Sequence, residues 1–220
     1  GSSLVGSEMC IRDSYKIKCL DPNLLIDTIL PPDNIVGSVV YPACEIVKPG
    51  TIKHIAGNRF SLGEPEGSES DRLKFISDIL KRAGFRAPIQ KNIRDEIWLK
   101  LIGNLSFNPI SALTGATLEQ ICNDQGTEAI VRAMMTEAKI IAEELGAKIN
   151  MSIEKRIEGA RKVGAHKTSM LQDIEAGKPI EIDSIIIAVK ELGELTCSPT
   201  PYIDTILNLT LQKAKLIGCL

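Results

Sequence analysis

The chain has 220 residues, of which 44% are hydrophobic and 25% charged; this composition excludes disordered and fibrous proteins and allows one large or two small domains. Its 26 basic and 28 acidic residues give a formal net charge of -2 without a basic block, so neither nucleic acid nor an anionic membrane is an expected partner. No apolar run approaches the ~20 residues that span a bilayer and no signal-peptide pattern opens the chain, so we expect a cytoplasmic location.

Short β-type patterns dominate the first part of the chain. Residues 1–14 show neither helical nor alternating periodicity, and we predict that they are foreign to the fold or disordered. Between residues 35 and 63 the runs IVGSVVYPACEIV, TIKHIAG and NRFSLGEP predict three strands. A helical pattern over 70–83 ends at Gly84, and FRAPI predicts a further short strand. Residues 15–91 therefore predict an α/β segment that is the last part of a larger domain.

From Asn92 onward every pattern is helical. Asn92 followed by Asp95 is an N-cap arrangement, and it predicts a helix through IRDEIWLKLIGNLSF. Apolar residues at three- and four-residue spacing predict further amphipathic helices over residues 131–145, 182–192 and 203–217. We therefore expect an all-α domain over residues 92–220.

Polar side chains recur at steps of four along the first of these helices. They are Glu96, Lys100, Asn104 and Asn108. At about 100° per residue, the heads from Lys100 to Asn108 drift by only about 80° and share one stripe, where they can converge on a small ligand. A lysine near an oxo group can donate a proton, and two carboxamides can bind a carboxylate and a hydroxyl. On spacing alone, a solvated helix face with an ordinary Glu96–Lys100 pair remains an open alternative.

A second group of polar residues lies in KTSMLQDIEAGKPIEID. Ser169 and Gln172 form a capping-box pattern, while Gly177 and Pro179 mark the end of a short helix. The spacing therefore favours Ser169 as an N-cap and Glu181 as a favourable charge in the first turn of the next helix. A catalytic or binding role for these two residues stays open beside that interpretation.

Two motif classes are missing from the sequence. The six cysteines show no CxxC and no short metal-ligand spacing, so we expect reduced, mostly buried thiols and no metal site. GxGxxG, which binds the pyrophosphate of a dinucleotide at a helix N-terminus, does not occur in these 220 residues.

The strings KLIGNLSFNPISALTGAT, TSMLQDIEAGKPIEID and SPTPYIDTILNL, in this order, resemble the C-terminal helical domain of the ketopantoate reductases. The similarity runs from about Asp21 to the end of the chain. It implies an α/β remnant of an NADPH-binding Rossmann domain, followed by an all-α C-terminal domain that is 6-phosphogluconate dehydrogenase C-terminal-like. The implied activity is NADPH-dependent reduction of 2-dehydropantoate to pantoate in pantothenate biosynthesis, with a small 2-oxo acid as the partner and a homodimer left open.

The resemblance also implies roles for individual residues. Lys100 matches the catalytic lysine that donates a proton to the ketone oxygen. Asn104, Asn108 and Ser169 match substrate-binding residues. Glu181 matches a glutamate near both the cofactor and the catalytic lysine, which makes it a candidate for catalysis and for cofactor binding.

Several positions depart from the family pattern. Ala43 matches a residue whose backbone contacts the cofactor, but Lys18 and Cys19 stand where the family has an Asn-Gly pair. Because GxGxxG is missing too, we infer that most of the Rossmann domain has been cut away and that the chain alone is weakly active or inactive.

Leu118 replaces a substrate-contacting asparagine of some relatives, and Ile187 replaces a small glycine. A sister reductase of another branched 2-oxo acid and a non-catalytic helical module for oligomerisation or ligand binding are the alternatives.

Overall fold

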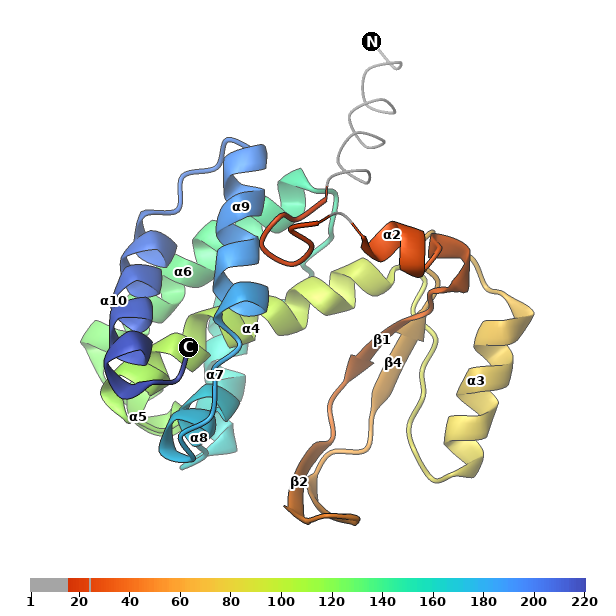
Figure 1. The fold of residues 1–220 in the computed structure, drawn as a ribbon, viewed down its shortest axis with the longest axis horizontal. Coiled ribbons are helices and arrows are strands. Elements are labelled where there is room, and N and C mark those ends of the chain that lie inside the picture. Colours follow the sequence, from red (N-terminus) through yellow and green to blue (C-terminus); the bar gives the residue numbers. More distant parts are fainter. Residues whose placement is uncertain (1–15, 24) are drawn as a thin grey trace. The chain divides into compact units, whose positions relative to one another are not determined.

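The computed structural model describes residues 16–23 and 25–220, which form two compact units (Figure 1). One unit is Ile26–Lys100, and the other combines Leu101–Leu220 with the described part of Gly1–Leu25. The prediction that residues 1–14 are foreign lies outside the described residues. Helix α4 (Ile93–Thr114) contains the point at which the chain passes between the units, and the domain limits at 15–91 and 92–220 remain predictions.

The unit Ile26–Lys100 contains two antiparallel strand pairs, β1 with β4 and β2 with β3. The prediction of three strands is wrong, because the first run divides at Tyr41 and Pro42; proline has no N–H to donate to a sheet and restricts the residue before it. The elements of this unit before α4 are α2 (Ile26–Ile29), η1 (Pro32–Asn34), β1 (Gly37–Val40), β2 (Ala43–Lys48), β3 (Thr51–Ala56), β4 (Phe60–Gly63) and α3 (Asp71–Arg82).

Helix α3 confirms the predicted helix over 70–83. Ser70 caps it by accepting a hydrogen bond from the amide of Leu73, and Gly84 takes a φ of +91°, which favours glycine. The segment after Gly84 then runs parallel to β4 through isolated bridges, so the FRAPI segment pairs with the sheet without forming a full strand. Pro88 contributes only its carbonyl oxygen, which accepts from the amide of Leu62 at 2.9 Å.

An ion pair between a buried carboxylate and a partly exposed arginine joins β4 to α3. The Glu64 side chain is fully buried directly after β4, and Arg72 binds both of its carboxylate oxygens, with Nε at 2.8 Å and Nη2 at 2.6 Å. The Ser70 hydroxyl donates to the same carboxylate, and Arg72 also donates to the carbonyl of Ile35. Hydrogen bonds from Arg72, and then from Ser70, lower the pKa of Glu64 from 4.5 to about 2. The pair therefore fixes the start of α3 only while Glu64 is ionised.

This pair predicts a defined acid sensitivity. Because the pKa of Glu64 is lower in the folded chain than in the unfolded chain, its contribution to stability is present above pH 4.5 and is lost as the pH falls toward about 2. We expect urea midpoints, followed by the fluorescence of the single tryptophan Trp98, to fall across this window. In Glu64→Gln the midpoint should be lower at neutral pH and should change less across the window. An equally steep fall in that variant would contradict this role of Glu64.

All elements of the described chain after α4 are helical, which confirms the predicted all-α region. The apolar positions over 131–145 and 203–217 bury most of their side chains, as their spacing predicts. The segment that begins near residue 182 opens as a π-helix before it becomes α-helical. The elements are α5 (Leu118–Asn123), α6 (Gln125–Glu144), α7 (Ile153–Val163), α8 (Ser169–Glu175), η2 (Asp183–Ile187), α9 (Ala188–Leu195) and α10 (Pro201–Ile217).

Two charged side chains attach α10 to its neighbours, and Figure 1 shows α10 beside α6. The buried carboxylate of Glu137 on α6 accepts from the amides of Tyr202 and Ile203, each at 3.0 Å, so it satisfies free donors in the first turn of α10. Lys213 donates to the carbonyl oxygens of Ala112 and Leu113, at 2.5 and 3.0 Å, near the end of α4. Helix α10 therefore braces the C-terminal end of α4.

The five described cysteines are free thiols, but the expectation that they are mostly buried is wrong. Only Cys122 and Cys219 are buried; Cys44 is exposed on β2, and Cys197 is exposed in the turn after α9. Cys44 lies on a two-stranded hairpin that presents most of its surface to solvent, so its exposure follows from its strand. Within the described residues, no helix is long and apolar enough to cross a membrane.

Candidate active site

Helix α4 carries the three residues of the predicted polar stripe. Its start confirms the predicted N-cap, because Asn92 accepts from the amide of Arg94 at 3.1 Å and donates to the Asp95 carboxylate at 2.9 Å. The helix is continuous through Thr114, seven residues beyond the predicted segment, although it contains Pro109. Lys100, Asn104 and Asn108 therefore lie on one unbroken helix, and their side chains share one stripe of it.

Lys100 is held against the end of β1. Its Nζ donates to the carbonyl oxygen of Val40 at 2.6 Å and lies 5.8 Å from the centroid of the Tyr41 ring. Lys100 is half-buried rather than extended into solvent. The interactions with Val40 and Tyr41 therefore place the ammonium group at the end of β1.

The two asparagines lie in the unit Leu101–Leu220. Asn104 is half-buried, and Asn108 is only 5% exposed. The Nδ2 of Asn108 has no hydrogen-bond partner among the described residues. A buried amide donor without a partner costs about 1–3 kcal/mol, so a ligand oxygen that accepts from it would recover part of that cost. Asn108 therefore fits a residue that binds an oxygen-rich ligand.

The predicted N-cap role of Ser169 is wrong. Thr168 caps α8, because its hydroxyl accepts from the amide of Leu171 at 3.3 Å, while Ser169 is the first residue of the helix and is exposed. Thr168 is 5% exposed, and threonine is among the residues preferred at an N-cap. The Ser169 hydroxyl is therefore not used in capping α8.

Glu181 and Ala43 lie near the starts of their elements. Glu181 is exposed and precedes η2, so it does not lie in the first turn of the helix as its spacing predicted. Ala43 opens β2, is half-buried and pairs with Ala56 of β3. Ala43 and Lys100 belong to the unit Ile26–Lys100, whereas Ser169 and Glu181 belong to the other unit with the asparagines.

A polar cluster beside Lys100 was missed by sequence reasoning. Oε1 of Glu96 accepts from the Tyr41 hydroxyl at 2.8 Å and from the Ser61 hydroxyl at 3.1 Å, and it also binds the Arg59 guanidinium. Of these residues only Glu96 lies on the predicted stripe. The other three come from β4 and from the ends of β1 and β4, and the pairing of those strands brings them to α4.

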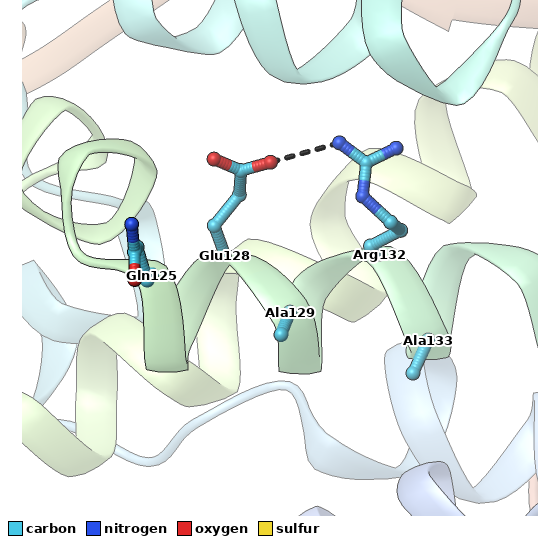
Figure 2. Close-up of a pocket in the computed structure, with 5 residues that line it drawn as sticks. All are labelled: Gln125, Glu128, Ala129, Arg132 and Ala133. Atoms are coloured by element: carbon cyan, nitrogen blue, oxygen red, sulfur yellow. Dashed lines mark hydrogen bonds and ion pairs between the residues drawn. The ribbon is translucent and has the colours of Figure 1, made fainter.

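A separate hollow on α6 contains none of the predicted site residues. It has a volume of about 340 Å³ and is open to solvent, and Figure 2 shows Glu128 and Arg132 bonded at its edge. Its lining residues are Gln125, Glu128, Ala129, Arg132 and Ala133. The predicted stripe and this hollow are thus different features of the chain.

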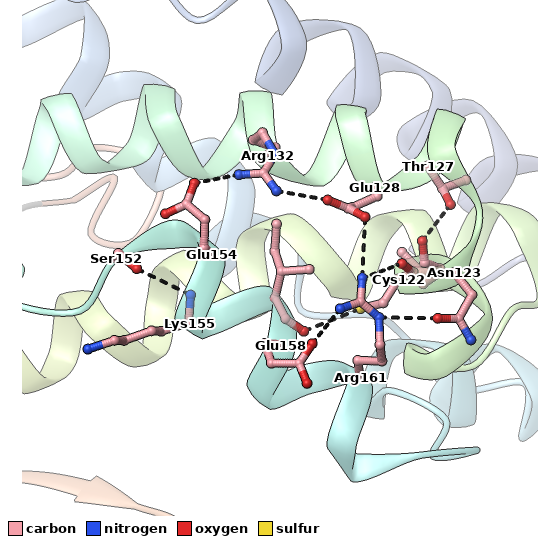
Figure 3. Close-up of polar contacts among 12 residues, drawn as sticks. Cys122, Asn123, Thr127, Glu128, Arg132, Ser152, Glu154, Lys155, Glu158 and Arg161 are labelled. Carbon is pink, nitrogen blue, oxygen red and sulfur yellow. Dashed lines mark hydrogen bonds and ion pairs between the residues drawn. The ribbon is translucent and has the colours of Figure 1, made fainter.

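Ion pairs near this hollow have a structural role. Figure 3 shows Arg161 of α7 donating to the carbonyl oxygen of Cys122 at 2.8 Å and to the side chain of Asn123 at 3.1 Å. The same guanidinium binds Glu128 and Glu158, and its hydrogen bond lowers the pKa of Glu158. Arg161 therefore caps the C-terminal end of α5 and ties it to α6 and α7.

The described residues provide little for a metal ion or a whole dinucleotide. They contain no group of three histidine, cysteine or acidic side chains that could hold a metal. The strand pairs are antiparallel, and no glycine-rich turn joins a strand to a helix N-terminus as pyrophosphate binding requires.

Comparisons with known proteins show the family of this chain. The family model "Ketopantoate reductase PanE/ApbA C terminal" matches residues 92–214. A 2-dehydropantoate 2-reductase of Mesorhizobium japonicum is 50% identical over 94% of this chain, and the chain spans 64% of that relative's length.

Two solved structures share the fold. One from Ralstonia solanacearum, provisionally assigned to the ketopantoate reductases, has a TM-score of 0.90 and 40% identity, covering 94% of this chain and 63% of its own. A dimeric ketopantoate reductase of Staphylococcus aureus has a TM-score of 0.72 and 22% identity, covering 88% of this chain and 66% of its own.

Proposed function

This chain belongs to the ketopantoate reductase family, and on that premise we propose that the protein containing it reduces 2-dehydropantoate to pantoate with NADPH. What favours this activity is the arrangement on α4, where a placed ammonium group is followed by two carboxamides on one stripe. The buried, unpartnered Nδ2 of Asn108 adds a donor that suits an oxygen-rich substrate.

Lys100 supplies the proton in this proposal. When bound, NADPH supplies the hydride that forms the new C–H bond at the keto carbon. The Lys100 ammonium stabilises the negative charge that develops on the ketone oxygen and transfers its proton there, so that the product is a hydroxyl and the lysine is left neutral. Solvent then restores the proton to Lys100.

The remaining site residues bind and orient the substrate. The Asn108 Nδ2 donates to a substrate oxygen, and Asn104 and the Ser169 hydroxyl complete the set of polar contacts. Glu181 is the second catalytic residue of the proposal, and its carboxylate accepts from the substrate hydroxyl. The backbone of Ala43 contacts the cofactor.

Two positions make the choice of substrate testable. Leu118 stands where some relatives have a substrate-contacting asparagine, and Ile187 stands where relatives have a glycine, so recognition of the substrate hydroxyl rests on the other polar residues of the proposed site. We expect the product of the complete reading frame to use 2-dehydropantoate with a kcat/KM at least about tenfold above that of a branched 2-oxo acid without the terminal hydroxyl, because losing a hydrogen-bonded hydroxyl costs roughly 1–3 kcal/mol. The reverse preference would assign the protein to a sister reductase.

The cofactor and the assembly are part of the same proposal. We expect NADPH to give the higher kcat/KM, with NADH compared in the same assay. We also propose a homodimer, as in the Staphylococcus aureus relative, to be checked by sedimentation of the purified protein. A stable dimer that neither binds NADPH nor reduces a 2-oxo acid would instead favour a non-catalytic helical module.

A further inference from the structure

Tyr41 lies beside two cations in the unit Ile26–Lys100. The guanidinium carbon of Arg59 is 5.0 Å from the centroid of the Tyr41 ring, and the Nζ of Lys100 is 5.8 Å from it. A cation within about 6 Å of a ring centroid is attracted by the negative charge on the face of the ring. The ring can therefore hold the two positive groups near each other despite their mutual repulsion.

Tyr41 is itself fixed at both ends. Its amide nitrogen donates to the carbonyl oxygen of Arg59 at 3.0 Å, which continues the pairing of β1 with β4. Its hydroxyl donates at 2.8 Å to Oε1 of Glu96, which lies one turn before Lys100 on α4. The Glu96 side chain that accepts this bond is only 13% exposed, whereas Tyr41 itself is exposed.

The same part of the chain contacts the Lys100 ammonium twice. Its Nζ donates to the carbonyl oxygen of Val40 at 2.6 Å and lies near the ring of the next residue, Tyr41. Arg59 and Ser61 also bind Oε1 of Glu96, the carboxylate to which the Tyr41 hydroxyl donates. The end of β1 thus contributes two contacts that help to place the ammonium.

We propose that Tyr41 is a positioning residue for Lys100, and that its ring orients the ammonium that donates the proton in the proposed reduction. This role rests on the proposed function. The proposal gives the two parts of the Tyr41 side chain different roles. The ring acts on Lys100 directly, and the hydroxyl acts by anchoring the ring to Glu96. Removing the ring therefore has a larger effect than removing the hydroxyl.

Kinetics of three variants test this separation. We expect Tyr41→Leu to lower kcat about tenfold or more with a smaller change in KM, because a proton donor displaced by about 1 Å loses much of its effect. Tyr41→Phe keeps the ring and should stay within about threefold of the unchanged protein, since it loses one hydrogen bond. Tyr202→Leu, at an exposed tyrosine of α10, is the matched control and should leave kcat unchanged.

An NMR measurement tests the contact without relying on activity. The Lys100 ammonium lies near the face of the Tyr41 ring, so the ε-proton shifts of Lys100, assigned with Lys100→Gln, should move toward those of a solvent-exposed lysine in Tyr41→Leu. Tyr41→Phe and Tyr202→Leu should leave these shifts in place.

If Tyr41→Leu matches Tyr202→Leu in kcat and in the Lys100 ε-proton shifts, or if Tyr41→Phe is as impaired as Tyr41→Leu, the positioning role is overturned. A protein that reduces no 2-oxo acid, yet shows the changed Lys100 shifts in Tyr41→Leu, would support the contact of Tyr41 with Lys100 and reject the proposed function alone.

Discussion

Replacing Lys100 by alanine should lower kcat for the reduction of 2-dehydropantoate by about 10²- to 10⁴-fold, the range expected when a general acid is removed. The reason is chemical, because the variant has no ammonium group to meet the charge that develops on the ketone oxygen. KM should change less, since Asn104, Asn108 and Ser169 still bind the substrate in the proposed site. Initial rates with saturating substrate and NADPH measure the effect.

The control for this prediction is Lys155→Ala, which removes an exposed lysine from α7 and should leave kcat unchanged. Lys100 is only half-buried and is the last residue of its unit, so we expect Lys100→Ala to remain folded. Trp98 fluorescence should show this. A Lys100→Ala protein with the kcat of the Lys155→Ala protein would remove Lys100 from the chemistry.

Replacing Arg72 by methionine should lower the folding free energy clearly more than an exposed substitution does, because it leaves the Glu64 carboxylate buried without its cation. The fully buried Glu64 carboxylate would keep the Ser70 hydroxyl but lose both hydrogen bonds from the guanidinium. Urea unfolding followed by Trp98 fluorescence measures the loss.

Arg82→Met is the matched control, because Arg82 is exposed in the last turn of the same helix, α3. It should change the unfolding free energy by less than about 0.5 kcal/mol. The double variant Glu64→Gln with Arg72→Met should recover part of the loss, since it no longer buries an unpaired charge. If Arg72→Met is as stable as Arg82→Met, the ion pair does not hold β4 to α3.

Local patterns predicted the parts of the fold that depend on neighbouring residues. The N-cap at Asn92, the capped helix after Ser70 and the all-helical second part follow from spacing and capping chemistry, and the structure confirms them. Local patterns do not distinguish between adjacent residues of similar chemistry as the N-cap of a helix. Thr168 and Ser169 both offer a hydroxyl, and the burial of Thr168, which depends on tertiary packing, accompanies its use as the cap.

The cluster around Lys100 shows why part of the candidate site could not be predicted. Tyr41, Arg59 and Ser61 meet Glu96 because Val40 pairs with Phe60 in the antiparallel ladder. No periodicity within either strand specifies that register, since register depends on which faces the whole unit buries. The stripe on α4 could be predicted from helix geometry alone. The residues that position Lys100 could not, because the pairing of β1 with β4 brings them together.

One measurement tests the central claim most directly: NADPH oxidation by the product of the complete reading frame, with pantoate quantified in the same reaction. The proposed function predicts that adding 2-dehydropantoate starts the oxidation, that pantoate forms in equal amount to the NADPH consumed, and that Lys100→Ala nearly abolishes both. NADPH consumption without pantoate, or no consumption by a folded protein that binds NADPH, would contradict it.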